Sequence, residues 1–270
     1  MAPRTLTLPP RGTLMVSTDL HGNLDDFEAL KRAFLRSPAD TIWLNLGDAV
    51  HGPSEKARAQ EPALYDFPDE SATIVAEIAA LRARFPDRVL YVLGNHDYGH
   101  IGGPHTRKFH DDEVAFLEAR MTPAAREQMR ALFSSALLGV VAPCGAFLSH
   151  GSPSDLLRDL ADLDRILYPP TRGSYEEQVL ESFLCCYGQQ RSVTDRLLAT
   201  VSRAGVEVRM LIQGHDRDEA GWFVYEGNQG CPVIFGAPRA NKRYLRLDLA
   251  ARYPSVQALR HGHEIVPVHG

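Results

Sequence analysis

Short apolar runs alternate with amphipathic segments over the first hundred residues, and this alternation constrains the fold most strongly. The apolar runs lie at 13–17, 41–46 and 88–93 and are rich in Leu, Ile and Val. Between them, 24–35 and 74–85 repeat apolar residues every three or four positions, as one face of a helix does. Strands that alternate with helices predict βαβ units, so the chain begins as an α/β structure.

From residue 139 the pattern changes to short apolar runs with one helical segment, near 193–204, among them. The runs lie at 139–142, 146–149, 208–212, 222–225, 233–235 and 244–249. Such a series predicts a second sheet that is more antiparallel than the first. We expect two mixed β-sheets packed face to face with helices on the outside, an α/β/β/α sandwich, and one domain over residues 1–270.

Two long segments follow neither pattern. Residues 52–67 and 99–121 have no clear period, and the second carries His100, His105 and His110. Long irregular segments beside a site are often functional loops. The sequence nevertheless assigns no role to 99–121.

The composition is that of an ordinary folded protein and argues against two classes of partner. Hydrophobic residues make up 44% of the chain, charged residues make up 23%, and the net charge is −5. This balance creates no positive field that would attract nucleic acid. No run approaches the roughly 20 consecutive apolar residues that cross a bilayer, and residues 1–13 lack the apolar core of a signal peptide. We therefore expect a cytoplasmic protein that binds neither nucleic acid nor membrane.

Side chains that can bind metals follow the ends of five predicted strands. In chain order they are Asp19, His21, Asp48, Asn95, His150 and His215. Loops at the carboxyl ends of strands line the crevice where open α/β sheets bind ligands, so we expect these side chains to meet there. Each residue alone is more often a turn, cap or hydrogen-bonded structural residue. Five strand ends that all carry donors together indicate a metal site.

The types of donor favour particular metals. Oxygen and imidazole ligands without thiolate suit Mn, Fe, Zn or Mg and exclude iron–sulfur clusters. Six donors are too many for one closed tetrahedral zinc site, whereas they suit two ions that share a carboxylate. We expect two divalent metal ions, Mn²⁺ first with iron or zinc as alternatives, and Asp48 as the shared ligand.

The sequence resembles the calcineurin-like metallophosphoesterases and, among them, the PPP family of serine/threonine protein phosphatases. The matching motifs are DLHGN at 19–23, GDAVHGP at 47–53, PDRVLYVLGNHD at 86–97, SHGSPSDL at 149–156, QGHD at 213–216 and IFGAP at 234–238. They stand in the family's order and span most of the chain. Other members of the superfamily carry a second histidine where this chain has Arg217, which favours the PPP-like branch.

The resemblance implies a hydrolase that cleaves phosphate monoesters, most of all phosphoserine and phosphothreonine in proteins. One metal ion would be held by Asp19, His21 and Asp48, and the other by Asp48, Asn95, His150 and His215. A hydroxide that bridges the two ions would attack phosphorus in line. As the general acid, His96 would protonate the leaving oxygen.

Some positions depart from the family's pattern. His51 and Gly52 replace an Asp-Arg pair, which removes the usual partner of the catalytic histidine and one phosphate-binding arginine. Leu93 stands where the family has another arginine, and the sequence GNHD stands where the family has GNHE. The candidates for binding substrate phosphate are therefore Arg191 and Arg239. The sequence does not show which group orients His96.

Two alternatives stay open. A hydrolase of dinucleoside polyphosphates or other small phosphoesters would share the same metal ligands. A phosphate-binding module that had lost its activity would retain the fold, but such proteins usually lose metal ligands first. Because every expected donor and His96 are present, an active enzyme is favoured.

Overall fold

Strand β2 (Thr13–Ser17) shows how the layers of the molecule arise. Alternate side chains point to opposite faces of a strand, so Leu14 and Val16 lie in one hydrophobic core and Met15 lies in another. The structure is a computed structural model, and it describes residues 3–108 and 110–270. Because both faces of β2 are buried, each of its faces must be covered by a further layer.

The first sheet has five strands in the order β13-β12-β2-β3-β4. The strands other than β2 are β3 (Thr41–Asn45), β4 (Val89–Tyr91), β12 (Arg243–Asp248) and β13 (Ile265–Pro267). The strands β2, β3 and β4 are parallel, whereas β12 runs antiparallel to β2 and to β13. Helices α1 (Leu24–Arg36) and α3 (Ser71–Arg84) connect the parallel strands, which confirms the predicted βαβ start.

The second sheet has six strands in the order β1-β7-β8-β9-β11-β10. They are β1 (Thr5–Thr7), β7 (Gly139–Ala142), β8 (Ala146–Leu148), β9 (Met210–Ile212), β10 (Trp222–Tyr225) and β11 (Gln229–Pro232). The pairs β7–β8 and β10–β11 are antiparallel, and the other pairs are parallel. Both sheets are thus mixed, as predicted, but the second is not the more antiparallel of the two.

Two strand predictions in the second half were wrong. The run 244–249 forms β12, which joins the first sheet because Leu245 and Leu247 fill the core between the sheets opposite β2. The strand expected at 233–235 is instead formed by the residues just before it, as β11 (Gln229–Pro232). A turn with positive φ at Glu226 and Gly227 starts β11 directly after β10, and Pro232, which has no N–H for the ladder, ends it.

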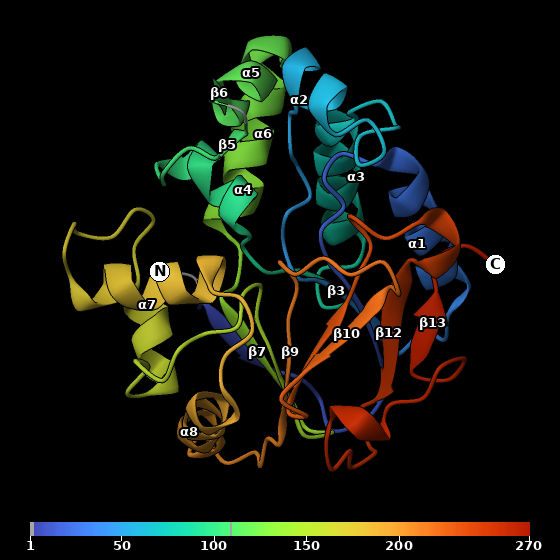
Figure 1. Ribbon diagram of the computed structural model, residues 1–270. Helices are drawn as coiled ribbons and strands as arrows, with labels where there is room; N and C mark the ends of the chain where they lie inside the picture. Colours follow the sequence, from blue (N-terminus) through green and yellow to red (C-terminus); the bar gives the residue numbers. More distant parts are fainter. Residues whose placement is uncertain (1–2, 109) are drawn as a thin grey trace.

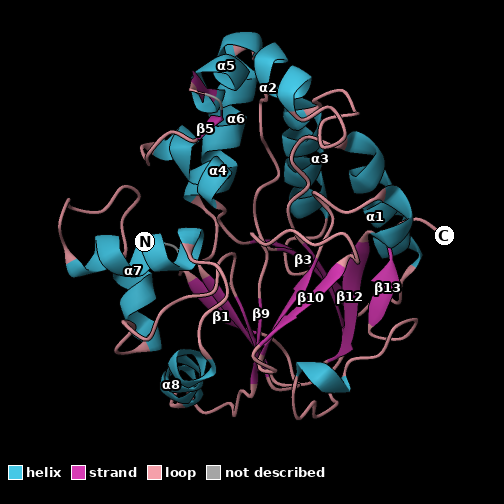
Figure 2. Ribbon diagram, in the orientation of Figure 1, coloured by secondary structure: helices cyan, strands magenta, loops and turns pink. Residues whose placement is uncertain are grey.

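The two sheets share one core, and helices cover their outer faces. Side chains of β2, β3, β7, β8 and β9 meet between the sheets, while the opposite faces of these strands pack against helices. Figure 2 shows the strands between α1 and α3 on one side and α7 (Tyr175–Cys185) and α8 (Arg191–Ser202) on the other. The other α-helices in the described part of the chain are α2 (Glu55–Gln60), α4 (Asn95–Tyr98), α5 (Glu113–Arg120) and α6 (Pro123–Ser134). This layering confirms the predicted sandwich.

Both segments expected to be irregular contain ordered elements. The first contains α2, and the second contains a short hairpin, β5 (Arg107–Lys108) and β6 (Asp111–Asp112), followed by α5. Helix α5 is capped by Asp112, whose side chain accepts from the Ala115 N–H. In Figure 1, α5 and α6 lie together on the side of α4, beyond the ends of the parallel strands. The second segment therefore adds a helix beside the predicted site.

Candidate active site

All six predicted metal donors meet at the carboxyl ends of the strands. Two follow β2, one follows β3, one begins α4 after β4, and two follow β8 and β9. Five of them line a cavity of about 250 Å³, namely Asp19, His21, Asp48, Asn95 and His215. The sixth, His150, lies behind this wall, with Nε2 3.0 Å from Asn95 Oδ1. The structure thus places together residues that lie up to 196 positions apart.

The carboxylate of Asp48 lies at the centre of the group. Its Oδ2 lies 3.6 Å from His21 Nε2 and 3.6 Å from His150 Nε2, and His21 Nε2 lies 3.4 Å from Asp19 Oδ1. Ligands about 2.0–2.3 Å from one ion stand roughly 3–3.5 Å from each other. Two sets of three have donor atoms within 4.8 Å of one another and include Asp48, one with Asp19 and His21 and one with His150 and His215. This spacing suits two cations that share one carboxylate.

The environment of His150 tests whether a cation fits. Its Nδ1 lies 2.8 Å from the carbonyl oxygen of Leu46, which can only accept, so Nδ1 carries the proton. Burial lowers the pKa of His150 and favours the neutral ring, whose Nε2 then bears a lone pair. That lone pair faces the oxygen of Asn95 at 3.0 Å, so two acceptors point at each other. A cation bound by both atoms removes this conflict, so the residues fit the metal.

The backbone at the site adopts a conformation that most residues avoid. Positive φ occurs at Asp19 (50°), His21 (46°), Asp48 (55°) and His215 (67°), four of the six non-glycine cases in the described part of the chain. Such conformations cost free energy and persist where the surrounding structure imposes them, most often at functional sites. A Cβ at Gly94 would overlap the Asp48 carboxylate, so glycine is needed where the chain between β4 and α4 comes this close to Asp48.

Burial shifts the protonation of the site toward neutral imidazoles. It lowers the pKa of His21 and His96, with a further contribution from neighbouring imidazoles, and it lowers the pKa of His215 to about 4. Burial also raises the pKa of the Asp48 carboxyl, helped by nearby Asp97 and Asp19. Neutral imidazole is the form that binds metal, and a cation would favour the ionised form of Asp48.

The side chain of His96 lies at the edge of the donor group. Its Nε2 is 4.0 Å from Asp48 Oδ2 and faces the cavity. Its Nδ1 points the other way, 3.7 Å from Glu113 Oε2. The predicted acid therefore stands beside the predicted ligands without being one of the central group.

The mouth of the cavity is formed by residues that the sequence analysis missed as site residues. Exposed side chains of Arg107, Tyr187 and Arg217 line it, above the buried donors. A signal for Arg217 was available, because it follows His215 by two positions in a loop that leaves a strand end. No local signal points to Glu113, since an acidic residue in the first turn of a helix is ordinary.

The two arginines proposed for substrate lie elsewhere and do not line this cavity. The Nε of Arg191 is 3.5 Å from Asp195 Oδ2, and 61% of the Arg191 side chain is exposed. The guanidinium of Arg239 pairs with Asp25 and lines a neighbouring cavity, which Phe235 separates from the first. Their predicted role in binding substrate stays a prediction.

Comparison with known families decides the assignment. The sequence profile of the calcineurin-like phosphoesterases matches residues 12–267. The chain belongs to the calcineurin-like phosphoesterase family. This phosphoesterase is therefore a metal-dependent hydrolase, with candidate His/Asp metal sites at the strand ends. No curated protein sequence matches it significantly.

Solved structures share the fold of this phosphoesterase at low sequence identity. A protein serine/threonine phosphatase from Saccharomyces cerevisiae, with similarity to human phosphatase PP5, superposes with a TM-score of 0.63 at 18% identity, covering 91% of this chain and 76% of the other. A cold-active protein-tyrosine phosphatase from a psychrophilic Shewanella gives 0.54 at 13% identity, covering 95% and 83%. In the described residues of the phosphoesterase, no helix has the length and apolar character to span a membrane.

Proposed function

We propose that this phosphoesterase hydrolyses phosphate monoesters, with phosphoserine and phosphothreonine side chains of proteins as its substrate class. The observation that carries the proposal is the layout of the cavity, which has buried metal-type donors at its base and the arginines Arg107 and Arg217 at its mouth. Arginine binds phosphate oxygens through a fork of fixed N–H donors. A phosphate group that enters the cavity would therefore pass these arginines and then reach the metal-type donors.

In this proposal the six donors hold two ions. One would be bound by Asp19, His21 and Asp48, and the other by Asp48, Asn95, His150 and His215. When bound, two divalent ions neutralise charge on the phosphate and make a water nucleophile available near neutral pH. We propose Mn²⁺, because all the donors are oxygen or imidazole.

Within the site, several side chains are already held in a single orientation. The Nδ1–H of His150 donates to Leu46 O, which directs Nε2 toward Asp48. The carboxylate of Asp19 accepts from the backbone N–H of His215 at 3.0 Å and from the Thr18 hydroxyl. Such outer contacts fix the tautomer and direction of a metal ligand. The donors are thus positioned by the fold before any ion binds.

We assign the role of general acid to His96. Its Nε2 faces the cavity, so a proton held there can pass to the oxygen that leaves phosphorus. An alkyl oxygen from serine or threonine is strongly basic and needs that proton as the bond breaks. An aryl oxygen needs it less, so the acid should matter most for phosphoserine and phosphothreonine.

A substrate panel tests the proposal. Protein freed of metal and then loaded with Mn²⁺ is offered a phosphoserine peptide, para-nitrophenyl phosphate and diadenosine tetraphosphate at equal concentrations. Metal-dependent release of phosphate from the peptide with the highest kcat/KM is the expected result. Preference for diadenosine tetraphosphate would instead assign a small-molecule hydrolase, and no hydrolysis with any metal would indicate a binding module.

A further inference from the structure

The side chain of Glu113 is buried beside the site although it comes from the 99–121 segment. Only 2% of Glu113 is exposed, and the residue begins α5. Its Oε1 lies 2.9 Å from His51 Nε2, and its Oε2 lies 3.7 Å from His96 Nδ1. A buried carboxylate is costly unless it is paired. One carboxylate thus faces two imidazoles, one with each oxygen.

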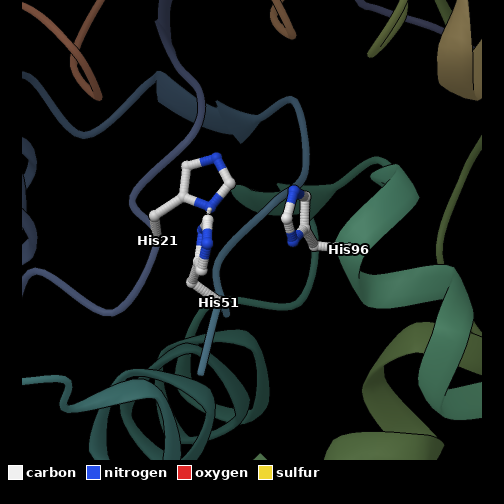
Figure 3. Close-up of side chains that lie close together, drawn as sticks. All are labelled: His21, His51 and His96. Atoms are coloured by element: carbon white, nitrogen blue, oxygen red, sulfur yellow. Dashed lines mark hydrogen bonds between the residues drawn. The ribbon is translucent and has the colours of Figure 1, made fainter. Parts of the chain in front are cut away.

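Hydrogen-bond chemistry connects Glu113 to the metal ligand His21. The Nε2 of His21 faces Asp19 and Asp48, so it must keep a lone pair to bind an ion. Its proton then lies on Nδ1, which is 2.6 Å from His51 Nδ1. Figure 3 shows this contact as the dashed line between His21 and His51.

The tautomer of His51 follows from that contact. Because His51 Nδ1 accepts from His21, its own proton lies on Nε2. That N–H points at the Glu113 carboxylate, with the Tyr65 hydroxyl 3.2 Å from the same nitrogen. The hydrogen bonds therefore run in one direction, with His21 donating to His51 and His51 donating to the Glu113 carboxylate.

The second oxygen of Glu113 faces the proposed acid. The Nδ1 of His96 is buried and makes no hydrogen bond among the described residues. Hydrogen bonds in an active site are often long without substrate and tighten when it binds. Its ring also stacks on His51, with centroids 4.5 Å apart, so the ring plane is held as well (Figure 3). Only a small shift would bring His96 Nδ1 within bonding distance of Glu113.

We propose that Glu113 is a positioning residue that orients both the metal ligand His21, through His51, and the general acid His96. The inference rests on the proposed function and adds to it. It assigns a role to the 99–121 segment, which supplies a carboxylate where the family's Asp-Arg pair is replaced by His51 and Gly52. Helix α5 packs directly on this position, since a Cβ at Gly52 would overlap Leu117.

Variants on the same helix provide the test. Glu113→Gln keeps the shape of the side chain and removes its charge. Glu118→Gln is the matched control, because Glu118 also bonds a buried histidine, His100, at 3.0 Å, and lies outside the donor group. Thermal unfolding of the metal-free proteins confirms that both variants fold.

The first measurement needs no turnover. Calorimetric titration of the metal-free proteins with Mn²⁺ should show roughly 10- to 100-fold weaker binding for Glu113→Gln, the usual effect of losing an outer partner of a metal ligand. Nitrogen shifts of ¹⁵N-labelled histidines in metal-free Glu113→Ala should show that His21 no longer carries its proton on Nδ1 alone. Wild-type values for Glu118→Gln are expected in the titration.

The second measurement follows the acid. Glu113→Gln should lower kcat for a phosphoserine peptide by roughly 10- to 100-fold and lower it less for para-nitrophenyl phosphate. When His96 is already replaced by alanine, Glu113→Gln should no longer lower kcat more for the peptide than for para-nitrophenyl phosphate, because Glu113 acts through His96.

Unchanged Mn²⁺ affinity together with an unchanged peptide-to-aryl ratio would overturn the role of Glu113 in an enzyme that is still active. A wild-type protein without phosphatase activity would instead refute the proposed function. The titration would then still decide whether Glu113 supports His21.

Discussion

The Oδ1 of Asp48 accepts a hydrogen bond of 2.9 Å from the backbone N–H of His96, which joins the chain after β3 to the chain after β4. The other oxygen, Oδ2, lies 4.0 Å from His96 Nε2. The carboxylate that is proposed to bind both ions therefore also holds the backbone of His96, the proposed acid. A change at Asp48 should affect both metal binding and the position of the acid.

Replacing Asp48 with Asn should reduce the metal content. The amide keeps one oxygen but cannot offer two anionic oxygens to two ions. We expect Asp48→Asn to retain one ion or none per chain by elemental analysis, where wild type retains two. Asp87→Asn, at an exposed turn, is the control. Wild-type stoichiometry in Asp48→Asn would show that Asp48 is not shared.

Adding Mn²⁺ to the metal-free protein should raise its thermal midpoint. The ions bind residues that meet only in the folded state, so they stabilise it by mass action, by about 2.7 kcal/mol at a concentration of 100 Kd. Differential scanning calorimetry with and without a chelator measures the shift. Equal midpoints in both conditions would mean that the donors do not hold Mn²⁺.

The variant His96→Ala should separate metal binding from catalysis. We expect both ions to remain, because the proposed ligands do not include His96. Turnover of alkyl phosphates should fall roughly 10²- to 10⁴-fold, the range for loss of a general acid, and turnover of aryl phosphates should fall less. Steady-state kinetics on both substrates decides, and equal losses would count against the acid role.

A methyl group at Gly94 should disturb the site although Gly94 binds nothing itself. Its φ is −100°, which alanine adopts freely, so the contact alone is tested. A Cβ there overlaps the Asp48 carboxylate. We expect at least about tenfold weaker Mn²⁺ binding in Gly94→Ala, as for other losses of ligand support. Gly270→Ala, where no positive φ is required and a Cβ meets nothing within 4 Å, should bind Mn²⁺ as wild type does.

Asp97→Ala should destabilise the metal-free protein. The Oδ2 of Asp97 is fully buried and accepts from the N–H groups of Asp48 and Gly94 and from the Tyr91 hydroxyl, at 2.8–3.0 Å. Alanine removes this acceptor and leaves three buried donors without a partner, and breaking buried hydrogen bonds costs about 1–3 kcal/mol. Urea unfolding measures the loss, and a midpoint equal to wild type would contradict this account.

The local pattern of the chain was enough to predict the parallel strands and the donors at their ends. The apolar run of β2 and the residues after it, Asp19 and His21, appear together in the sequence, and the same holds for β3 with Asp48. A strand that is buried on both faces consists of apolar residues, so polar side chains such as metal donors occur only after the strand has ended. This explains why every predicted donor lies at the site.

The partners of those strands depended on contacts between distant segments. Nothing near β12 in sequence shows that it pairs with β2, more than 200 positions away, because its apolar alternation suits either sheet equally well. The same limit applies to Arg217, whose side chain becomes part of the cavity mouth only when β9 is placed.

The sequence by itself determined the parallel strands, the six metal-type donors that follow strand ends and the histidine next to Asn95, because each depends on residues adjacent in the chain. Only the tertiary structure decided that Glu113 faces His51 and His96, and that Arg191 and Arg239 lie outside the cavity. These positions depend on how α5 and the loops pack against the strand ends. That packing is set by long-range burial, which leaves no periodic signal in the sequence.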